Sequence, residues 1–208
     1  MLTLGHRGCT RAAPENTWEA FEAALAAGLD GCETDVRRCA DGSLVLVHDE
    51  RLADGRRVAD LDRVTLEAAL GHAVPTADEV LARWPDAVWN LEVKDQAAAV
   101  PLLHVLRRHD LERVLVTSFD HPVAMRFALE SQAGAGVLIA HRPLRGVTPF
   151  AAWRRSGIGT LVLPFPFLAA WLVEEAAQAG MNVGAWGLSG TEQQAQARAA
   201  GAAILIVD

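Results

Sequence analysis

Eight short apolar runs, separated by longer segments, recur along the whole sequence. They cover residues 2–5, 31–36, 88–94, 113–118, 136–140, 160–163, 182–186 and 203–207. Between them lie segments with apolar residues at helical spacing, of which Trp18, Phe21 and Leu25 are a clear example. Strands that alternate with helices are typical of a parallel sheet with helical crossovers. The pattern therefore predicts an α/β fold built on eight parallel strands.

The number of strands favours a closed (β/α)₈ (TIM) barrel, and a doubly wound open sheet is the alternative that the pattern allows. A barrel of 208 residues lies near the lower size limit for this fold, so its loops must be short. A further apolar run, 44–48, follows residues 31–36 too closely for a helix to intervene, and Asp41-Gly42 can form the turn. We expect a β-hairpin excursion near residues 33–48, an irregular insertion over 49–75, and one barrel domain over 1–208.

Helix boundaries are marked by residues that can cap the free backbone groups at helix ends. Asn16, with Glu19 three residues later, is predicted to cap a helix that Gly28 ends. Thr76 and Glu79 have the spacing of a capping box. The sequence therefore predicts helices that begin just after residues 16 and 76.

Composition and charge restrict the partners of the protein. Hydrophobic residues make up 51% of the chain, which excludes disorder, and the net charge is −7. Nucleic-acid and anionic-membrane binding rest on basic patches, so neither is expected as the main function. No apolar run is long enough to span a membrane and no N-terminal signal is present, so we expect a cytoplasmic protein without stable membrane insertion.

Cys9, Cys32 and Cys39 form no CxxC pair, which argues against a disulfide framework or a zinc site. The oligomeric state is left open.

Charged and polar residues gather where predicted strands end. They are His6 and Arg7 after the first strand, Glu33 and Asp35 in the second, His48 at the end of run 44–48, and Glu92 and Lys94 in the strand over 88–94. In a parallel α/β barrel the active site forms at the carboxyl ends of the strands. We therefore expect these residues to converge.

Strand parity sharpens this expectation. Side chains alternate along a strand, so Glu33 and Asp35 share one face, as do Glu92 and Lys94. Unpaired buried carboxylates are costly, and a hard divalent cation relieves their repulsion. The three carboxylates predict a site for Mg²⁺ or Ca²⁺. If the hairpin turns near Asp41-Gly42, His48 lies across from Thr34 or Asp35 and beside this site.

Several motifs occur in a fixed order. They are His6-Arg7-Gly8, Pro14-Glu15-Asn16-Thr17, Glu33-x-Asp35-Val36, Asp41-Gly42 with His48-Asp49, and Glu92-Val93-Lys94. Together they resemble the glycerophosphodiester phosphodiesterase family, and Val74-Pro75-Thr76 and Ser118-Phe119 extend the resemblance over nearly the whole chain. Two segments depart from the family pattern, Trp186-Gly187-Leu188-Ser189 and the ending Val207-Asp208. These departures concern the leaving-group pocket and substrate choice rather than the catalytic set.

The resemblance implies a (β/α)₈ barrel that hydrolyses glycerophosphodiesters to sn-glycerol 3-phosphate and an alcohol. It implies Glu33, Asp35 and Glu92 as ligands of the divalent cation, His6 and His48 as general acid and base, and Arg7 and Lys94 as phosphate contacts. These residue types suit the reaction, because imidazole titrates near neutral pH and the cations offset phosphate charge. The nucleophile is either a neighbouring substrate hydroxyl, which gives a cyclic phosphate, or water.

Three residues at the margin of this set have less specific expected roles. Phe119 and Trp186 follow strands and are predicted either to wall the alcohol pocket or to pack in the core. Glu15 is predicted either to support a histidine or to place a favourable charge at a helix start.

Three other functions are compatible with parts of the pattern. A lysophospholipase D-like or sphingomyelinase D-like enzyme would need an exposed apolar surface, for which the segment 161–171 is the candidate. A non-catalytic barrel that binds an anion is the second alternative. A glycosidase is the third, and His6 with His48 argues against it because that chemistry uses two carboxyl groups.

Overall fold

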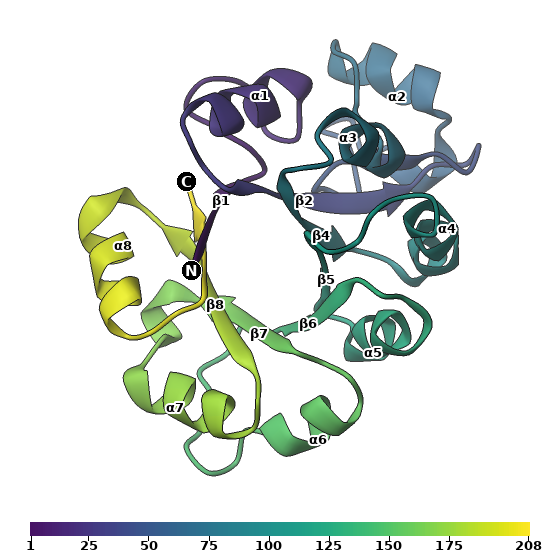
Figure 1. Cartoon of the computed structure of the whole chain (residues 1–208). Helices are drawn as coiled ribbons and strands as arrows, with labels where there is room; N and C mark the ends of the chain where they lie inside the picture. Colours follow the sequence, from purple (N-terminus) through teal and green to yellow (C-terminus); the bar gives the residue numbers. More distant parts are fainter.

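The strands close into a barrel whose wall joins both ends of the sequence (Figure 1). The computed structural model describes residues 1–208. The barrel strands are β1 (Leu2–His6), β2 (Gly31–Arg38), β4 (Val88–Val93), β5 (Val114–Ser118), β6 (Gly134–Leu138), β7 (Thr160–Pro164), β8 (Asn182–Leu188) and β9 (Ile204–Val207). Successive strands pair in parallel, and β1 closes the barrel by pairing with both β2 and β9. The predicted barrel is confirmed, and the open sheet is excluded.

Helices surround the wall on its outer side (Figure 1). They are α1 (Trp18–Ala26), α2 (Arg63–Leu70), α3 (Ala77–Arg83), α4 (Gln96–Leu106), α5 (His121–Glu130), α6 (Phe150–Arg155), α7 (Ala170–Gln178) and α8 (Gly190–Ala199), with short 3₁₀ turns at Val58–Asp60 and Phe165–Phe167. The capping box at Thr76 and Glu79 is confirmed. None of the helices is both long and apolar enough to cross a membrane.

The stretch from 49 to 75 is not the irregular insertion that we expected, because it contains α2. Asp62 caps this helix by accepting a hydrogen bond from the Thr65 amide. Leu66 is its single buried residue, and it packs in a small core with Val45 and Val58. Leu70, four residues after Leu66, also packs against this core, but a pattern of two residues in a helix of eight is too short to stand out in the sequence.

The predicted hairpin leaves the barrel wall between β2 and β4. Its second strand, β3 (Leu44–Leu46), pairs antiparallel with β2 outside the closed wall. The ladder is shorter than the predicted run 44–48, although the Val47 amide still donates to the Asp35 carbonyl at 3.0 Å. This last bond holds residue 48 beside the carboxyl end of β2.

Alternate residues along each strand point into the barrel, and their character changes along the axis. The inward layer near the middle is apolar and consists of Leu4, Val88, Leu115, Leu138, Val162, Ile204 and Ile206. Gly31 belongs to the same wall, where a Cβ atom would lie 1.8 Å from the Val88 carbonyl oxygen. The next inward positions, at the carboxyl ends, are occupied by His6, Glu33, Asp35, Glu92, Lys94 and Trp186. An apolar floor thus supports a polar upper layer.

Candidate active site

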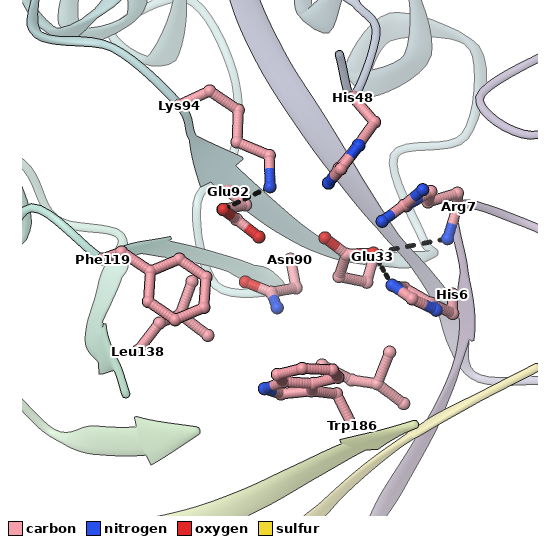
Figure 2. Close-up of a pocket in the computed structure, with 11 residues that line it drawn as sticks. His6, Arg7, Glu33, His48, Asn90, Glu92, Lys94, Phe119, Leu138 and Trp186 are labelled. Atoms are coloured by element: carbon pink, nitrogen blue, oxygen red, sulfur yellow. Dashed lines mark hydrogen bonds and ion pairs between the residues drawn. The ribbon is translucent and has the colours of Figure 1, made fainter. Parts of the chain in front are cut away.

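A pocket opens above the apolar floor, at the carboxyl ends of the strands (Figure 2). Its lining consists of His6, Arg7, Glu33, His48, Asn90, Glu92, Lys94, Phe119, Leu138, Trp186 and Ile206. All the predicted site residues except Asp35 and Glu15 line it, and Asp35 lies directly behind the lining. The residues come from β1, β2, β4, the loops after β3 and β5, and β8, so the convergence predicted from strand ends is borne out geometrically.

Three carboxylates form the centre of this site. Glu33, Asp35 and Glu92 each place an oxygen within 4.8 Å of the others. The strand register accounts for this, because Asp35 of β2 stands opposite Glu92 of β4. Lys94 is inserted between two of them, with Nζ 2.9 Å from Asp35 Oδ1 and also in contact with Glu92 Oε1. Glu33 and Asp35 are two residues apart on β2, and Glu92 and Lys94 are two residues apart at the end of β4. Each pair therefore points to the same side of its strand, and the pairing of β2 with β4 brings the two pairs together.

The charges in this cluster do not balance. Burial, together with the charges of Asp35 and Glu92, raises the pKa of Glu33 well above its usual range. Burial also raises the pKa of Glu92, although Lys94 opposes this effect. For Asp35, burial is outweighed by Lys94, by a hydrogen bond from Asn16 and by Arg7, so its pKa lies below the usual value. Glu33 is therefore the carboxyl group whose charged form the protein's own cations stabilise least.

Two residues with left-handed backbone shape the loop after β1. Arg7 has φ 58° and Asn16 has φ 57°, and the two are joined by a hydrogen bond from the Asn16 amide to the Arg7 carbonyl at 2.9 Å. Non-glycine residues adopt this region at a cost, and such strain concentrates at functional sites. Gly8 completes the loop, because a Cβ atom there would lie 2.6 Å from the backbone of Ala20 in α1. The loop is thereby pressed against α1 with Arg7 turned toward the carboxylates.

Asn16 is not the helix cap that we predicted. Thr17 caps α1 instead, by accepting a hydrogen bond from the Ala20 amide. The buried Asn16 amide group donates to Asp35 Oδ2 at 2.9 Å, and its oxygen accepts from the Thr34 hydroxyl at 2.6 Å. Asn16 thus fixes one oxygen of Asp35. A short polar residue just before a helix suits either role, so the sequence alone could not separate this contact from capping.

Each of the two predicted catalytic histidines is held by an aspartate. His6 Nδ1 lies 2.7 Å from Asp208 Oδ1, and His48 Nδ1 lies 2.8 Å from Asp49 Oδ1. A carboxylate at Nδ1 requires a proton there, which leaves Nε2 of a neutral ring as the acceptor. His6 Nε2 lies 3.8 Å from Glu33 Oε2, and both rings point into the pocket (Figure 2). Neither aspartate was among the site residues predicted from the sequence.

The remaining predicted residues divide between the pocket and its support. Phe119 and Trp186 both line the pocket, Phe119 with 46% of its surface exposed. Glu15 contacts no histidine; it accepts a hydrogen bond from Arg7 Nη1 at 2.8 Å, so the expectation that it supports a histidine is wrong. Arg7 also forms an ion pair with Asp35, with 3.3 Å between Nε and Oδ2.

Asn90 is a pocket residue that the sequence analysis missed. Its oxygen accepts a hydrogen bond from Thr117, whereas its Nδ2, like Trp186 Nε1, is buried without an acceptor in the protein. The sequence contains a signal that could have identified Asn90. It lies two residues before Glu92 and four before Lys94, so it points to the same side of β4. Asn90 and Trp186 both line the pocket, so they belong to its wall although Nδ2 and Nε1 themselves are buried.

The donor set suits a hard divalent cation. The three converging groups are all carboxylates, and oxygen ligands are those that Mg²⁺ and Ca²⁺ prefer. Positive charge at this position would also favour the charged form of Glu33. Glu33, Asp35 and Glu92 are therefore arranged so that they fit Mg²⁺ or Ca²⁺, the ions expected from the sequence.

Comparison with known proteins identifies the family of the chain. The glycerophosphoryl diester phosphodiesterase family model matches residues 6–208. The probable glycerophosphodiester phosphodiesterase 2 of Mycobacterium tuberculosis is 31% identical over 207 aligned residues, which cover 89% of this chain and 78% of that protein. The glycerophosphodiester phosphodiesterase of Caldanaerobacter subterraneus is 34% identical over 58% of each protein.

Solved structures show the same architecture. The glycerophosphodiester phosphodiesterase of Thermotoga maritima superimposes with a TM-score of 0.83 at 25% identity, covering all of this chain and 94% of that one. A phosphodiesterase of Oleispira antarctica, crystallised with the product sn-glycerol-3-phosphate, has the same fold, with a TM-score of 0.86 at 21% identity over all of this chain and 92% of that one. The chain therefore belongs to the glycerophosphoryl diester phosphodiesterase family and is a phosphoric diester hydrolase.

Proposed function

We propose that the protein hydrolyses glycerophosphodiesters to sn-glycerol 3-phosphate and an alcohol by general acid–base catalysis. The observation that carries this proposal is that His6 and His48, each held at Nδ1 by an aspartate, face one pocket with three buried carboxylates. The product found with the Oleispira antarctica phosphodiesterase supports the choice of product. Because β1 and β9 contribute His6 and its partner Asp208, we treat residues 1–208 as one catalytic unit.

Glu33, Asp35 and Glu92 would hold the divalent cation, Mg²⁺ or Ca²⁺. When bound, the ion supplies positive charge that offsets the charge developing on the phosphate. Lys94 and Arg7 add two further cations at the pocket, and the guanidinium group can contact two phosphate oxygens at once. The acidic chain thus presents local positive charge where an anionic substrate would bind.

The two histidines divide the proton transfers. One accepts the proton of the attacking hydroxyl through Nε2, and the other donates a proton to the leaving alkoxide. Asp208 and Asp49 orient the rings and stabilise the imidazolium that forms. The same residues serve either a neighbouring substrate hydroxyl or water as nucleophile, and phosphorus NMR during turnover distinguishes them, since only the first gives a cyclic phosphate.

The pocket wall offers contacts for the rest of the substrate. Asn90 and Trp186 line the pocket, so their side chains would lie beside the bound substrate. Phe119 adds an apolar wall at the mouth. The segment proposed to favour a lipid substrate does not support that alternative, because Leu161 and Leu163 are buried and Phe167 is half-buried.

We also propose a cytoplasmic location. The support is that all three cysteines are free thiols, of which Cys32 and Cys39 are buried. Unpaired cysteines are typical of proteins kept in a reducing compartment.

The test is a panel of glycerophosphodiesters assayed with Mg²⁺ or Ca²⁺ and with EDTA. We expect hydrolysis that EDTA abolishes and that added cation restores. His6→Ala and His48→Ala should each lower kcat by about 10²–10⁴-fold, with unchanged unfolding curves. His104→Ala is the matched control, because this exposed histidine contacts only Arg107 on the outside of the barrel. Full activity in EDTA would remove the cation from the proposal, and a wild-type rate in either variant would remove that histidine.

A further inference from the structure

One long segment departs from the acidic character of the chain. Residues 131–173 contain no aspartate or glutamate, although the whole protein has a net charge of −7. The same segment contains four arginines, at positions 142, 145, 154 and 155. All the charged residues of this segment, which runs from β6 through α6 to the start of α7, are therefore positive.

The loop between β6 and α6, residues 139–149, presents apolar side chains to solvent within this positive segment. Leu144 is 63% exposed and Val147 is 70% exposed. Arg142 and Arg145 lie beside them and are exposed as well. The loop follows the carboxyl end of β6, at the end of the barrel where Phe119 of the neighbouring β5–α5 loop is also exposed. Exposed aliphatic residues next to cations thus stand on the same end of the barrel as the pocket.

Of the two arginines of this loop, Arg142 forms no internal ion pair and Arg145 forms one. Among the four arginines of the segment, only Arg145 has a carboxylate partner, Glu175 at 3.6 Å. Glu175 also accepts a hydrogen bond from the Gly146 amide at 3.2 Å, so it anchors the loop to α7. The Arg142 guanidinium lies against the Phe167 ring, 5.9 Å from its centroid. Arg142 therefore keeps its charge available to an external anion.

A cleft of about 380 Å³ lies behind the exposed residues, between the loop, α5 and α6. Ile139, Trp153 and the inner sides of Leu144 and Val147 form its apolar walls, and His141 and Arg142 lie at its polar edge. Apolar surface that is bordered by cations matches the interface of a bilayer, where acyl chains lie beneath phosphate groups.

Exposed aliphatic side chains next to arginines favour a lipid surface over other classes of partner. A nucleic acid would use the arginines but would leave Leu144 and Val147 in water. A second copy of this chain, docked through the same loop, would bring like charges together. We propose that the β6–α6 loop is a peripheral docking surface for an anionic lipid bilayer, which it contacts through Leu144, Val147, Arg142 and Arg145. Docking does not depend on the catalytic groups.

Co-sedimentation with vesicles tests this surface directly. We expect the full-length protein to bind phosphatidylcholine vesicles that contain phosphatidylglycerol, and not vesicles of phosphatidylcholine alone. Arg142→Gln with Arg145→Gln should weaken binding roughly fivefold per charge, and high salt should do the same to the wild type. Leu144→Ser with Val147→Ser should weaken it by a similar factor. Val64→Ser with Leu129→Ser is the matched control, because these residues are 75% and 77% exposed but lie outside the positive segment.

Several results would overturn the proposal that the β6–α6 loop docks on an anionic bilayer. They are absence of binding to the anionic vesicles, equal binding by the loop variants and the wild type, and equal binding to vesicles without anionic lipid. Protein dimers or RNA complexes that the loop variants abolish, without vesicle binding, would assign the loop to those partners instead. Turnover of a soluble glycerophosphodiester, measured on the same variants, should stay at the wild-type rate, so this test is read independently of the proposed reaction.

Discussion

Replacing Asn16 tests how the carboxylate cluster of Glu33, Asp35 and Glu92 is held in place. The Asn16 side chain donates to Asp35 Oδ2 and accepts from Thr34 Oγ1, and all three residues are buried. Asn16→Ala removes a hydrogen bond to a charged group, worth about 1.5–3 kcal/mol, and leaves the Thr34 hydroxyl without a partner, at a cost of about 1–3 kcal/mol. Together the two terms should lower the free energy of unfolding by about 2.5–6 kcal/mol.

The backbone conformation of residue 16 makes a separate contribution to the change in the free energy of unfolding, and it can be tested with glycine. Asn16 has φ 57°, a region that costs alanine about 1–2 kcal/mol and glycine almost nothing. Asn16→Gly loses the same hydrogen bonds, and glycine's greater freedom in the unfolded chain offsets part of its advantage. We therefore expect the glycine variant to be about 1 kcal/mol more stable than the alanine variant.

Urea unfolding followed by circular dichroism, in EDTA so that no cation adds stability, measures all three proteins. Thr34→Val provides the control, because without the hydroxyl the loss of Asn16 leaves no orphaned donor. The double variant should then be about 1 kcal/mol more stable than the sum of the single effects predicts. An Asn16→Ala protein within about 0.5 kcal/mol of the wild type, the range of ordinary surface changes, would refute this account of the site.

Three further outcomes follow from named contacts. Asp208→Asn should lower kcat about tenfold to a hundredfold, because a charge-assisted bond to His6 is worth about 1.5–3 kcal/mol; steady-state kinetics measure it, and an unchanged rate would show that the contact does not assist catalysis. Burial raises the pKa of Cys32 to about 12 and that of Cys39 to about 11, so a thiol reagent at mildly alkaline pH should modify both only after denaturation; rapid reaction of all three thiols in the native protein would contradict this. Thr76→Ala should lower the free energy of unfolding by about 1 kcal/mol through loss of the capping box of α3, measured by urea unfolding, and no change would mean that the cap adds nothing.

Features set by local periodicity could be predicted from the sequence. The strand-helix alternation predicted the barrel, and two-residue spacing brought Glu33 and Asp35 onto one face. The pairing of β2 with β4 then follows from the fold, and it places Glu92 with them. Local rules sufficed here because the inward parity of a strand is fixed by its own sequence.

Features that depend on closure of the chain could not be predicted in the same way. The contact between His6 and Asp208 joins residues 202 positions apart and exists only because β1 pairs with β9. The sequence predicts that Glu15 either supports a histidine or adds charge at a helix start, and that Asn16 caps a helix. In the structure Glu15 binds Arg7 and Asn16 binds Asp35. Their residue types fit both assignments, and only the path of the loop decides between them.

The hairpin arm has a consequence for how this pocket can vary. His48 follows β3, which lies outside the closed ring of strands, while the carboxylates belong to the ring itself. Leu44 and Leu46 of β3 are buried in the main core, so the arm itself cannot be lost without cost to the barrel. Changes confined to the residues that follow β3 would instead move or replace His48, whereas Glu33, Asp35 and Glu92 would stay where the ring holds them.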